Sequence, residues 1–293
     1  MSLHELVDDY YSSYDYRNLR DETKVQYKYF IGVMLNTEVD GDKLSTLDYK
    51  SVPTRVAKSA YNQWCEKGIH MANHIMSVTR ILFNHGVREE LCQLNPFANV
   101  RRRTVERRKT VWGRDDVQKL LTVAYSDFNT RNIGLIAHMA YEWCQRLGDM
   151  RMLTWDNIDF DTHTVHIEQS KRHADVHLPI SDDLFGMLQQ QEADFGFQPY
   201  VAPRPNSYRG EYIPYSLHKL PLHGRELMNA AGLPKELRLS DLRRTGVTEM
   251  VEAGVGMPAI MSVTGHASPN SVKPYLKNTL KSAELALTTR RNT

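Results

Sequence analysis

A strongly basic run one third of the way along the chain is the feature that most limits how this sequence can fold. Residues 101–109 read RRRTVERRK, with six basic residues and one acid, Glu106. Such a run is usually a solvated linker, and a linker of this charge can also lie along a phosphate backbone. We therefore expect a domain at residues 1–100, a linker at 101–110 and a second domain at 111–293.

The first hundred residues have the apolar spacing of helices. Pro53 is tolerated in the first turn of a helix, Gly68 ends that helix, and Asn95 before Pro96 closes the segment. A turn at residues 39–42 separates the second helix from the third. The pattern predicts a small all-α domain of four helices, at residues 3–14, 21–36, 52–66 and 70–86.

After the basic run, helical spacing mixes with strand-like alternation. Residues 164–168 and 175–180 alternate as two strands of a hairpin, whose turn carries Ser170, Lys171 and Arg172. Residues 195–215 are rich in Gly, Pro and Tyr, which indicates an exposed loop. The fold class is therefore mainly α with a small β-sheet or hairpin. Further helices are predicted at 114–126, 130–144, 147–154, 181–192, 216–231, 241–252, 257–263, 268–277 and 280–289.

Composition excludes several protein classes. With 41% hydrophobic and 25% charged residues, the chain reads as a soluble globular protein, and its N-terminus lacks the basic and apolar regions of a signal peptide. Cys65, Cys92 and Cys144 have no CxxC spacing, which favours a reducing cytosol and argues against structural zinc. The net charge of +2 is a weak global signal for nucleic acid, so the local basic run matters more.

Four histidines crowd the predicted hairpin. Strand alternation can bring His166 and His177 onto one face, and His163 and His173 lie nearby in the sequence. No cysteine or helical HxxxH pair completes a ligand set near them. We interpret them as surface residues of the hairpin and expect no metal site.

A stretch near the C-terminus combines residues that suit phosphate chemistry. Arg243 and Arg244 stand near the start of a predicted helix, His266 follows Gly265, and Tyr275 comes nine residues after that histidine. An arginine, a histidine and a late tyrosine suit the holding of a phosphate while a phenolic oxygen attacks it.

Each polar residue also has an ordinary structural explanation. Arg146 and Asp149 are three apart on a predicted helix, where a surface ion pair is the default. Lys171 in a hairpin turn is usually a solvated tip. Ser240 before an aspartate is a good helix N-cap, and Tyr275 can be a core aromatic with a hydrated hydroxyl.

Taken in order, the motifs resemble those of the tyrosine recombinase (phage integrase) family, across nearly the whole chain. That family's first box has an arginine three residues before an acid, here Arg146 and Asp149. A hairpin lysine follows in the setting QSKxxxxVxLP, here Lys171. The box H-x-L-R-[RH]-T reads SDLRRT at residues 240–245, so Ser240 replaces the family's histidine. The glycine–histidine pair and the tyrosine nine residues later complete the match.

The resemblance implies a catalytic set in which Arg146 and Arg243 hold the scissile phosphate through paired donors. Tyr275 would form a covalent 3′-phosphotyrosine, and Lys171 would protonate the leaving 5′-oxygen. His266 would hydrogen-bond a non-bridging oxygen or help to deprotonate the tyrosine. No cofactor or metal is implied, because the phosphotyrosine keeps the bond energy for rejoining.

The resemblance also implies roles for two residues that support the catalytic set. Asp149 would brace the arginines from behind. Ser240 would occupy the position of the family's histidine, where a hydroxyl can hydrogen-bond but cannot be a useful base near neutral pH.

The implied architecture is a two-domain clamp around double-stranded DNA, with a four-helix core-binding domain and an α+β catalytic domain. Family members act as homo-tetramers on paired attachment sites, with a C-terminal helix, here near 280–287, docking on a neighbouring subunit. Host DNA-bending or directionality factors are possible partners, and the location would be the cytoplasm of a bacterial or phage-infected cell. The expected DNA contacts come from the basic run, namely Arg101, Arg102, Arg103, Arg107, Arg108 and Lys109.

The expected function is integration of phage or mobile-element DNA. Three alternatives stay open at this point. They are a chromosome-dimer-resolving enzyme, a topoisomerase IB-like enzyme acting on one duplex, and a non-catalytic DNA-binding regulator in which Ser240 marks lost activity.

Overall fold

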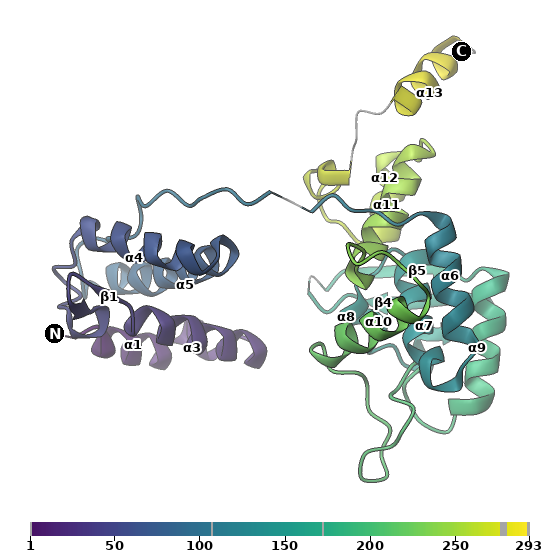
Figure 1. The fold of residues 1–293 in the computed structure, drawn as a ribbon, viewed down its shortest axis with the longest axis horizontal. Coiled ribbons are helices and arrows are strands. Elements are labelled where there is room, and N and C mark those ends of the chain that lie inside the picture. Colours follow the sequence, from purple (N-terminus) through teal and green to yellow (C-terminus); the bar gives the residue numbers. More distant parts are fainter. Residues whose placement is uncertain (1, 107, 172, 276–279, 292–293) are drawn as a thin grey trace. The chain divides into compact units, whose positions relative to one another are not determined.

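The computed structural model describes residues 2–106, 108–171, 173–275 and 280–291. The chain forms two compact units, Met1–Arg108 and Lys109–Thr293 (Figure 1). Within the described ranges, no helix combines the length and the apolar content needed to cross a membrane.

The N-terminal unit is a helical bundle whose apolar stripes face one core. In its longest helix, Ile75, Val78 and Leu82 recur at helical spacing and are buried. They share this core with Leu6 and Met34 from other helices. The helices are α1 (Leu3–Ser12), α2 (Tyr14–Arg17), α3 (Asp21–Leu35), α4 (Thr54–Lys67) and α5 (Ile69–Arg88).

Two local features of this unit differ from the four predicted helices. The predicted turn at residues 39–42 is the tip of a small hairpin of β1 (Glu38–Val39) and β2 (Asp42–Lys43), followed by the 3-10 turn η1 (Leu44–Thr46). The first helix is interrupted at Ser13, because its hydroxyl accepts a hydrogen bond from the backbone N–H of Tyr16 and starts α2.

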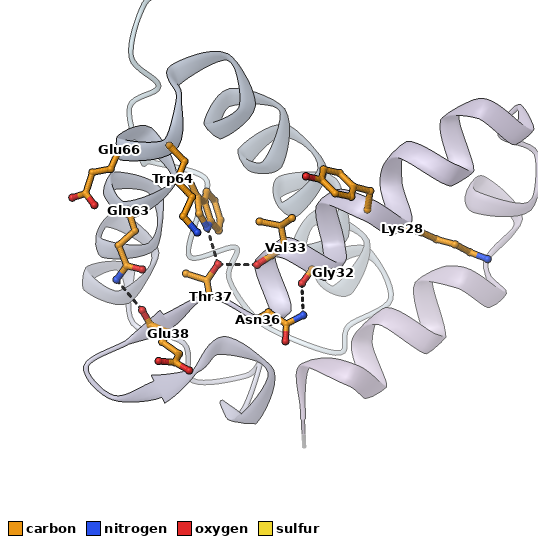
Figure 2. Close-up of a pocket in the computed structure, with 11 residues that line it drawn as sticks. Lys28, Gly32, Val33, Asn36, Thr37, Glu38, Gln63, Trp64 and Glu66 are labelled. Carbon is orange, nitrogen blue, oxygen red and sulfur yellow. Dashed lines mark hydrogen bonds between the residues drawn. The ribbon is translucent and has the colours of Figure 1, made fainter. Parts of the chain in front are cut away.

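A surface pocket of about 760 Å³ lies between the end of α3 and α4 (Figure 2). Trp64 forms part of its wall, stacks on Phe97 and donates its indole N–H to Thr37 Oγ1 at 2.8 Å. The Thr37 hydroxyl in turn donates to the carbonyl of Val33, and Gln63 donates to the carbonyl of Glu38. These bonds join the α3 end to α4, so the polar groups here serve the fold of the unit.

The C-terminal unit is organised around one almost fully buried helix, α7 (Phe128–Glu142). Every residue from 131 to 140 is buried, as expected for a helix enclosed on all sides. It packs against α6 (Arg114–Tyr125), α9 (Asp182–Phe195) and α11 (Leu242–Glu252). This packing places the end of α7 beside α11, and both lead into the candidate site.

A three-stranded antiparallel sheet lies beside these helices, in the order β3 (Ile158–Asp159), β4 (Thr164–Glu168) and β5 (Asp175–Pro179). The register pairs buried Val165 with Leu178, whereas His166 and His177 face each other on the exposed side. The predicted hairpin is therefore confirmed, and β3 is an additional short strand.

The mainly α fold with a small sheet is confirmed, but one predicted helix is wrong. In place of the predicted helix at 268–277, Pro269–Ser271 and Lys273–Tyr275 form two 3-10 turns, because Ser268 caps the first turn and Pro274 has no N–H to continue a helix. Residues 276 and 277 of that prediction lie outside the described residues. The remaining elements are α8 (Leu147–Met150), η2 (Trp155–Asn157), α10 (Lys219–Ala230), η3 (Leu239–Asp241), α12 (Met257–Thr264), η4 (Pro269–Ser271), η5 (Lys273–Tyr275) and α13 (Leu280–Arg291).

Candidate functional site

Arg146 stands at the junction of α7 and α8. The chain turns sharply after α7 through Cys144, whose φ is 51°, so that Arg146 immediately precedes α8. Its Nη1 donates to Gln169 Oε1 at 3.1 Å and lies 3.5 Å from Asp149 Oδ2. The guanidinium is therefore held from one side while about a quarter of the side chain stays accessible.

Asp149 ties this helix turn to the end of strand β4. Its Oδ1 accepts hydrogen bonds from the Ser170 hydroxyl at 2.5 Å and from the Ser170 backbone N–H at 3.3 Å. The carboxylate side chain is only 3% exposed. An ordinary surface ion pair between Arg146 and Asp149 is thus the wrong description, because the acid is buried and bonded to a second element.

Arg243 reaches the same cluster from α11. Its Nη2 donates to the carbonyl of Thr264 at 2.8 Å, and its Nη1 donates to Gln145 Oε1 at 3.3 Å. Burial and the nearby charge of Arg146 lower the pKa of Arg243. The ordinary pKa of arginine is so high that Arg243 remains cationic after this lowering. The two guanidiniums therefore form a local concentration of positive charge.

The end of α12 brings His266 against Arg243. Gly265 caps the helix in the left-handed region at φ 66°, and an added Cβ would lie 2.5 Å from Gln169 Nε2. Glycine is therefore required by both conformation and space. The next residue, His266, places its Nε2 3.4 Å from Arg243 Nη2 and its Nδ1 2.6 Å from Thr264 Oγ1.

Tyr275 lies at the end of the second 3-10 turn, half-buried beside this cluster. Its ring centroid is 6.2 Å from that of His266, and the Arg244 guanidinium carbon is 5.2 Å from the Tyr275 ring centroid. Arg146, Arg243, His266 and Tyr275 therefore come from four separate segments and meet in one place.

Ser240 lies at the rim of the cluster, whereas Lys171 is not brought into it. Exposed Ser240 lines a cavity of about 310 Å³ together with Arg146 and Arg243. Its predicted role as a helix N-cap is wrong, because α11 begins at Leu242 and Ser240 lies within the preceding 3-10 turn. Lys171 is exposed at the tip of the β4–β5 hairpin, and within the described residues it makes no hydrogen bond to the arginines.

Buried amides and a hydroxyl at the back of the site were not anticipated as functional residues. Gln145, Gln169 and Thr264 are fully buried. The two amides and the Thr264 backbone carbonyl carry the hydrogen bonds that connect the two arginines, and the Thr264 hydroxyl contacts His266. Gln169 is the first residue of the QSK setting of Lys171. Gln145 and Thr264 have only their position as a signal, since each lies within two residues of a predicted site residue.

Trp112, which follows the basic run, anchors the chain to the segment that carries Ser240 and Arg243. Trp112 is buried, its backbone N–H donates to Thr245 Oγ1 at 2.9 Å, and its indole N–H donates to the carbonyl of Arg238 at 3.0 Å. These two contacts bracket the 3-10 turn and the start of α11, which carry Ser240 and Arg243.

The predicted DNA-contacting residues have different surroundings. Arg102 donates to Ser77 Oγ, and Arg103 donates to Asn62 Oδ1, so this part of the run lies against α4 and α5. Arg101 and Lys109 are exposed and Arg108 is half-buried. Arg107 lies outside the described residues.

The hairpin histidines form a ring pair. The His166 and His177 rings stack with centroids 4.3 Å apart, and His166 Nε2 lies 3.4 Å from Asp175 Oδ1. Among the described residues, no group of three or more His, Cys, Asp or Glu side chains could hold a metal ion.

Comparison with known proteins gives a consistent result. Residues 112–281 match the Phage integrase family. No curated protein matches the sequence. A crystal structure of a lambda integrase dimer bound to a COC′ core site is similar, with a TM-score of 0.76 and 20% identity over 95% of this chain and 78% of that chain.

Two further structures extend this likeness. A lambda integrase tetramer bound to a Holliday junction has a TM-score of 0.76 and 20% identity, again over 95% of this chain and 78% of that chain. The Tn1549 transposon integrase in complex with circular intermediate DNA has a TM-score of 0.76 and 16% identity, over 98% of this chain and 99% of that chain. At these identities the structural matches establish the fold.

Proposed function

The chain belongs to the phage integrase family, and we propose that it is a site-specific recombinase that cleaves and rejoins DNA through a 3′-phosphotyrosine at Tyr275. The observation that carries this proposal is the meeting of Arg146, Arg243 and His266 in one hydrogen-bonded cluster beside Tyr275. A substrate phosphodiester is an anion, and this is where the unit concentrates cationic donors from separate elements.

In the proposed cleavage step, the Tyr275 oxygen attacks the scissile phosphorus in line with the leaving 5′-oxygen. A Tyr275 Oη–P bond forms, the P–O5′ bond breaks, and the DNA strand leaves with a free 5′-hydroxyl. Arg146 and Arg243 donate to the non-bridging oxygens, where negative charge accumulates. Rejoining is the reverse attack by a 5′-hydroxyl on the phosphotyrosine, so neither step consumes a nucleotide.

Two protons must move during cleavage. The phenolic proton of Tyr275 goes to His266, whose Nε2 faces the cluster, and the leaving 5′-oxygen receives a proton from Lys171. Lys171 lies at the exposed tip of the β4–β5 hairpin, directly after Ser170, whose hydroxyl donates to Asp149 beside Arg146. In this scheme DNA binding brings the lysine side chain to the phosphate. Asp149 braces Arg146 in this scheme.

The proposed substrate is a pair of double-stranded attachment sites belonging to a phage or another mobile element. The lambda and Tn1549 integrases share the fold, and their structures hold a core site, a Holliday junction and a circular intermediate. The N-terminal unit and the basic run supply further DNA contacts, and four copies assemble on two sites with α13 as the docking helix.

The test is covalent trapping on a nicked substrate, in which the cleaved end diffuses away and the intermediate accumulates. Wild-type protein should form a protease-sensitive protein–DNA complex, and Tyr275→Phe should form none while binding the same DNA with similar affinity. A covalent complex that persists with Tyr275→Phe would exclude this tyrosine as the nucleophile.

Two intact substrates, a supercoiled plasmid and a pair of sites, separate the alternatives. A topoisomerase-like enzyme would relax a single supercoiled duplex and give no exchange between two sites. A DNA-binding regulator would bind and yield no covalent complex with any variant. Exchange of strands between two sites by the wild-type protein supports the recombinase.

A further inference from the structure

Two buried glutamines link the two arginines of the site. Gln145 immediately precedes Arg146, and Gln169 follows strand β4. The Gln169 Nε2 group donates to Gln145 Oε1 at 2.7 Å, and both side chains are fully buried. A direct amide–amide contact therefore runs behind the guanidiniums.

The hydrogen-bond network fixes the orientation of both amides. The second hydrogen of Gln169 Nε2 goes to the carbonyl of Thr264 at 2.8 Å. The two hydrogens of Gln145 Nε2 go to the carbonyls of Trp143 at 2.8 Å and Val263 at 2.7 Å. All four N–H donors thus have acceptors, and flipping either amide would turn its oxygen toward carbonyls.

The amide oxygens consequently face the arginines. Gln169 Oε1 accepts from Arg146 Nη1 at 3.1 Å, and Gln145 Oε1 accepts from Arg243 Nη1 at 3.3 Å. An amide oxygen is a neutral acceptor, so it orients a guanidinium without cancelling its charge. A carboxylate in the same place would bind the guanidinium more strongly and compete with a phosphate for it.

We propose that Gln145 and Gln169 form a neutral bridge that positions Arg146 and Arg243 as one phosphate-binding unit. This inference rests on the proposed function and adds two positioning residues to it. The cluster holds two guanidiniums and the Asp149 carboxylate, so it keeps a net positive charge for the substrate. With a second carboxylate in place of Gln169, that excess would vanish.

Variants of Gln169 test the bridge, and the chain supplies a matched control. Gln169→Met removes the amide while keeping the length of the side chain, and Gln169→Glu keeps the shape but adds charge. The control is Gln191→Met on α9, because Gln191 is also fully buried and donates to Asn132 Oδ1 at 2.8 Å and to the carbonyl of Val201 at 2.9 Å.

The first measurement does not depend on turnover. Inorganic phosphate is titrated into each protein while the arginine Nε–Hε signals are followed by NMR. Wild type and Gln191→Met should show the same saturable shifts of Arg146 and Arg243. Both Gln169 variants should bind phosphate about tenfold more weakly. In Gln169→Met a guanidinium misplaced by a fraction of an ångström loses part of its donor geometry, and in Gln169→Glu the added carboxylate competes with phosphate for the guanidinium. Equal affinity in all four proteins would overturn the bridge.

The second measurement is single-turnover covalent trapping on a nicked site. Gln169→Met should bind DNA as wild type does but form the complex about 100-fold more slowly, which is the scale of a small misplacement at a reacting centre. On a substrate with a neutral methylphosphonate at the scissile position this defect should shrink, whereas a general folding defect would persist. If Gln169→Met reacts like Gln191→Met on both substrates, the bridge has no positioning role.

The two proposals fail in different ways. If wild-type protein forms no covalent complex through Tyr275, the recombinase assignment is wrong, and the phosphate titration alone decides the bridge. If wild type reacts and the Gln169 variants match the control, the recombinase stands and the bridge is wrong.

Discussion

Thr264 Oγ1 lies 2.6 Å from His266 Nδ1, and this contact determines which imidazole nitrogen faces the arginines. The Thr264 hydroxyl donates its single hydrogen to the carbonyl of Ile260 at 2.7 Å. It can therefore only accept from His266, so a neutral imidazole carries its proton on Nδ1 and turns its Nε2 lone pair toward Arg243 Nη2.

We expect Thr264→Val to slow covalent trapping while Thr264→Ser keeps it near the wild-type rate. Valine preserves the buried shape but removes the Thr264 oxygen that accepts from Nδ1, so this contact no longer favours one tautomer. The expected loss is about 10²-fold, the lower end of what general acid–base assistance contributes. Single-turnover trapping measures this loss of rate. Equal rates for the valine and serine variants would show that the Thr264 contact with His266 does not contribute to the reaction.

Gly265→Ala should lower the free energy of unfolding by about 3 kcal/mol. A left-handed alanine costs about 1 kcal/mol, and displacing the Gln169 amide disturbs two buried hydrogen bonds. Gly232→Ala is the matched control, because Gly232 has the same φ of 66° and open space around its Cβ position. Denaturant unfolding measures the free energy of unfolding of both variants. Equal losses of this free energy would show that the Gln169 side chain can move aside without destabilising the protein.

The fold class could be predicted because its signals are local, and the main cluster could be predicted because its motifs resemble those of a known family. Apolar periodicity marked the buried helices, and the order of short motifs brought Arg146, Arg243, His266 and Tyr275 into one set, which the structure places together. Arg146 and Arg243 are nearly a hundred residues apart, so spacing alone could not have joined them.

The remaining features depend on tertiary contacts. Gln169 opens the QSK setting of Lys171, but the sequence does not show that it bonds Gln145, because the partners of a buried amide lie on other segments. Ser240 looked like a helix cap, yet the 3-10 turn before Leu242 moves the helix start past it. Pro274 is a sequence feature that argues against the predicted helix at 268–277, since proline cannot continue a helix.

Replacing Arg101, Arg102 and Arg103 with alanine should weaken DNA binding and flatten its dependence on salt. Each DNA phosphate that the variant no longer neutralises should reduce the slope of log K against log salt by about one unit. Arg88→Ala is a suitable control, because that arginine is already paired with Asp15 at 2.6 Å. Binding titrations at several salt concentrations measure the slopes, and an unchanged slope in the triple variant would mean that these arginines serve the Ser77 and Asn62 contacts alone.

The last prediction concerns Ser240, which replaces the family's histidine beside Arg146 and Arg243. The serine is exposed and lies outside α11, so Ser240→Ala removes neither a helix cap nor a core contact. If Lys171 and His266 carry both proton transfers, Ser240→Ala should trap DNA at nearly the wild-type rate. Ser240→His should match or exceed that rate, because the 310 Å³ cavity at this position leaves space next to Arg146 and Arg243, the proposed phosphate-binding arginines.

General acid–base assistance typically raises a rate about 10²–10⁴-fold. Any gain in trapping rate from Ser240→His therefore measures the acid–base assistance that the protein lacks with serine at this position. Single-turnover trapping of the three proteins on one nicked site gives the comparison, with thermal melting to establish equal folding. A large loss in Ser240→Ala at an unchanged melting temperature would contradict this division of labour. The serine hydroxyl would then be bonding the phosphate or the leaving oxygen directly, and Lys171 and His266 would not suffice for the two proton transfers.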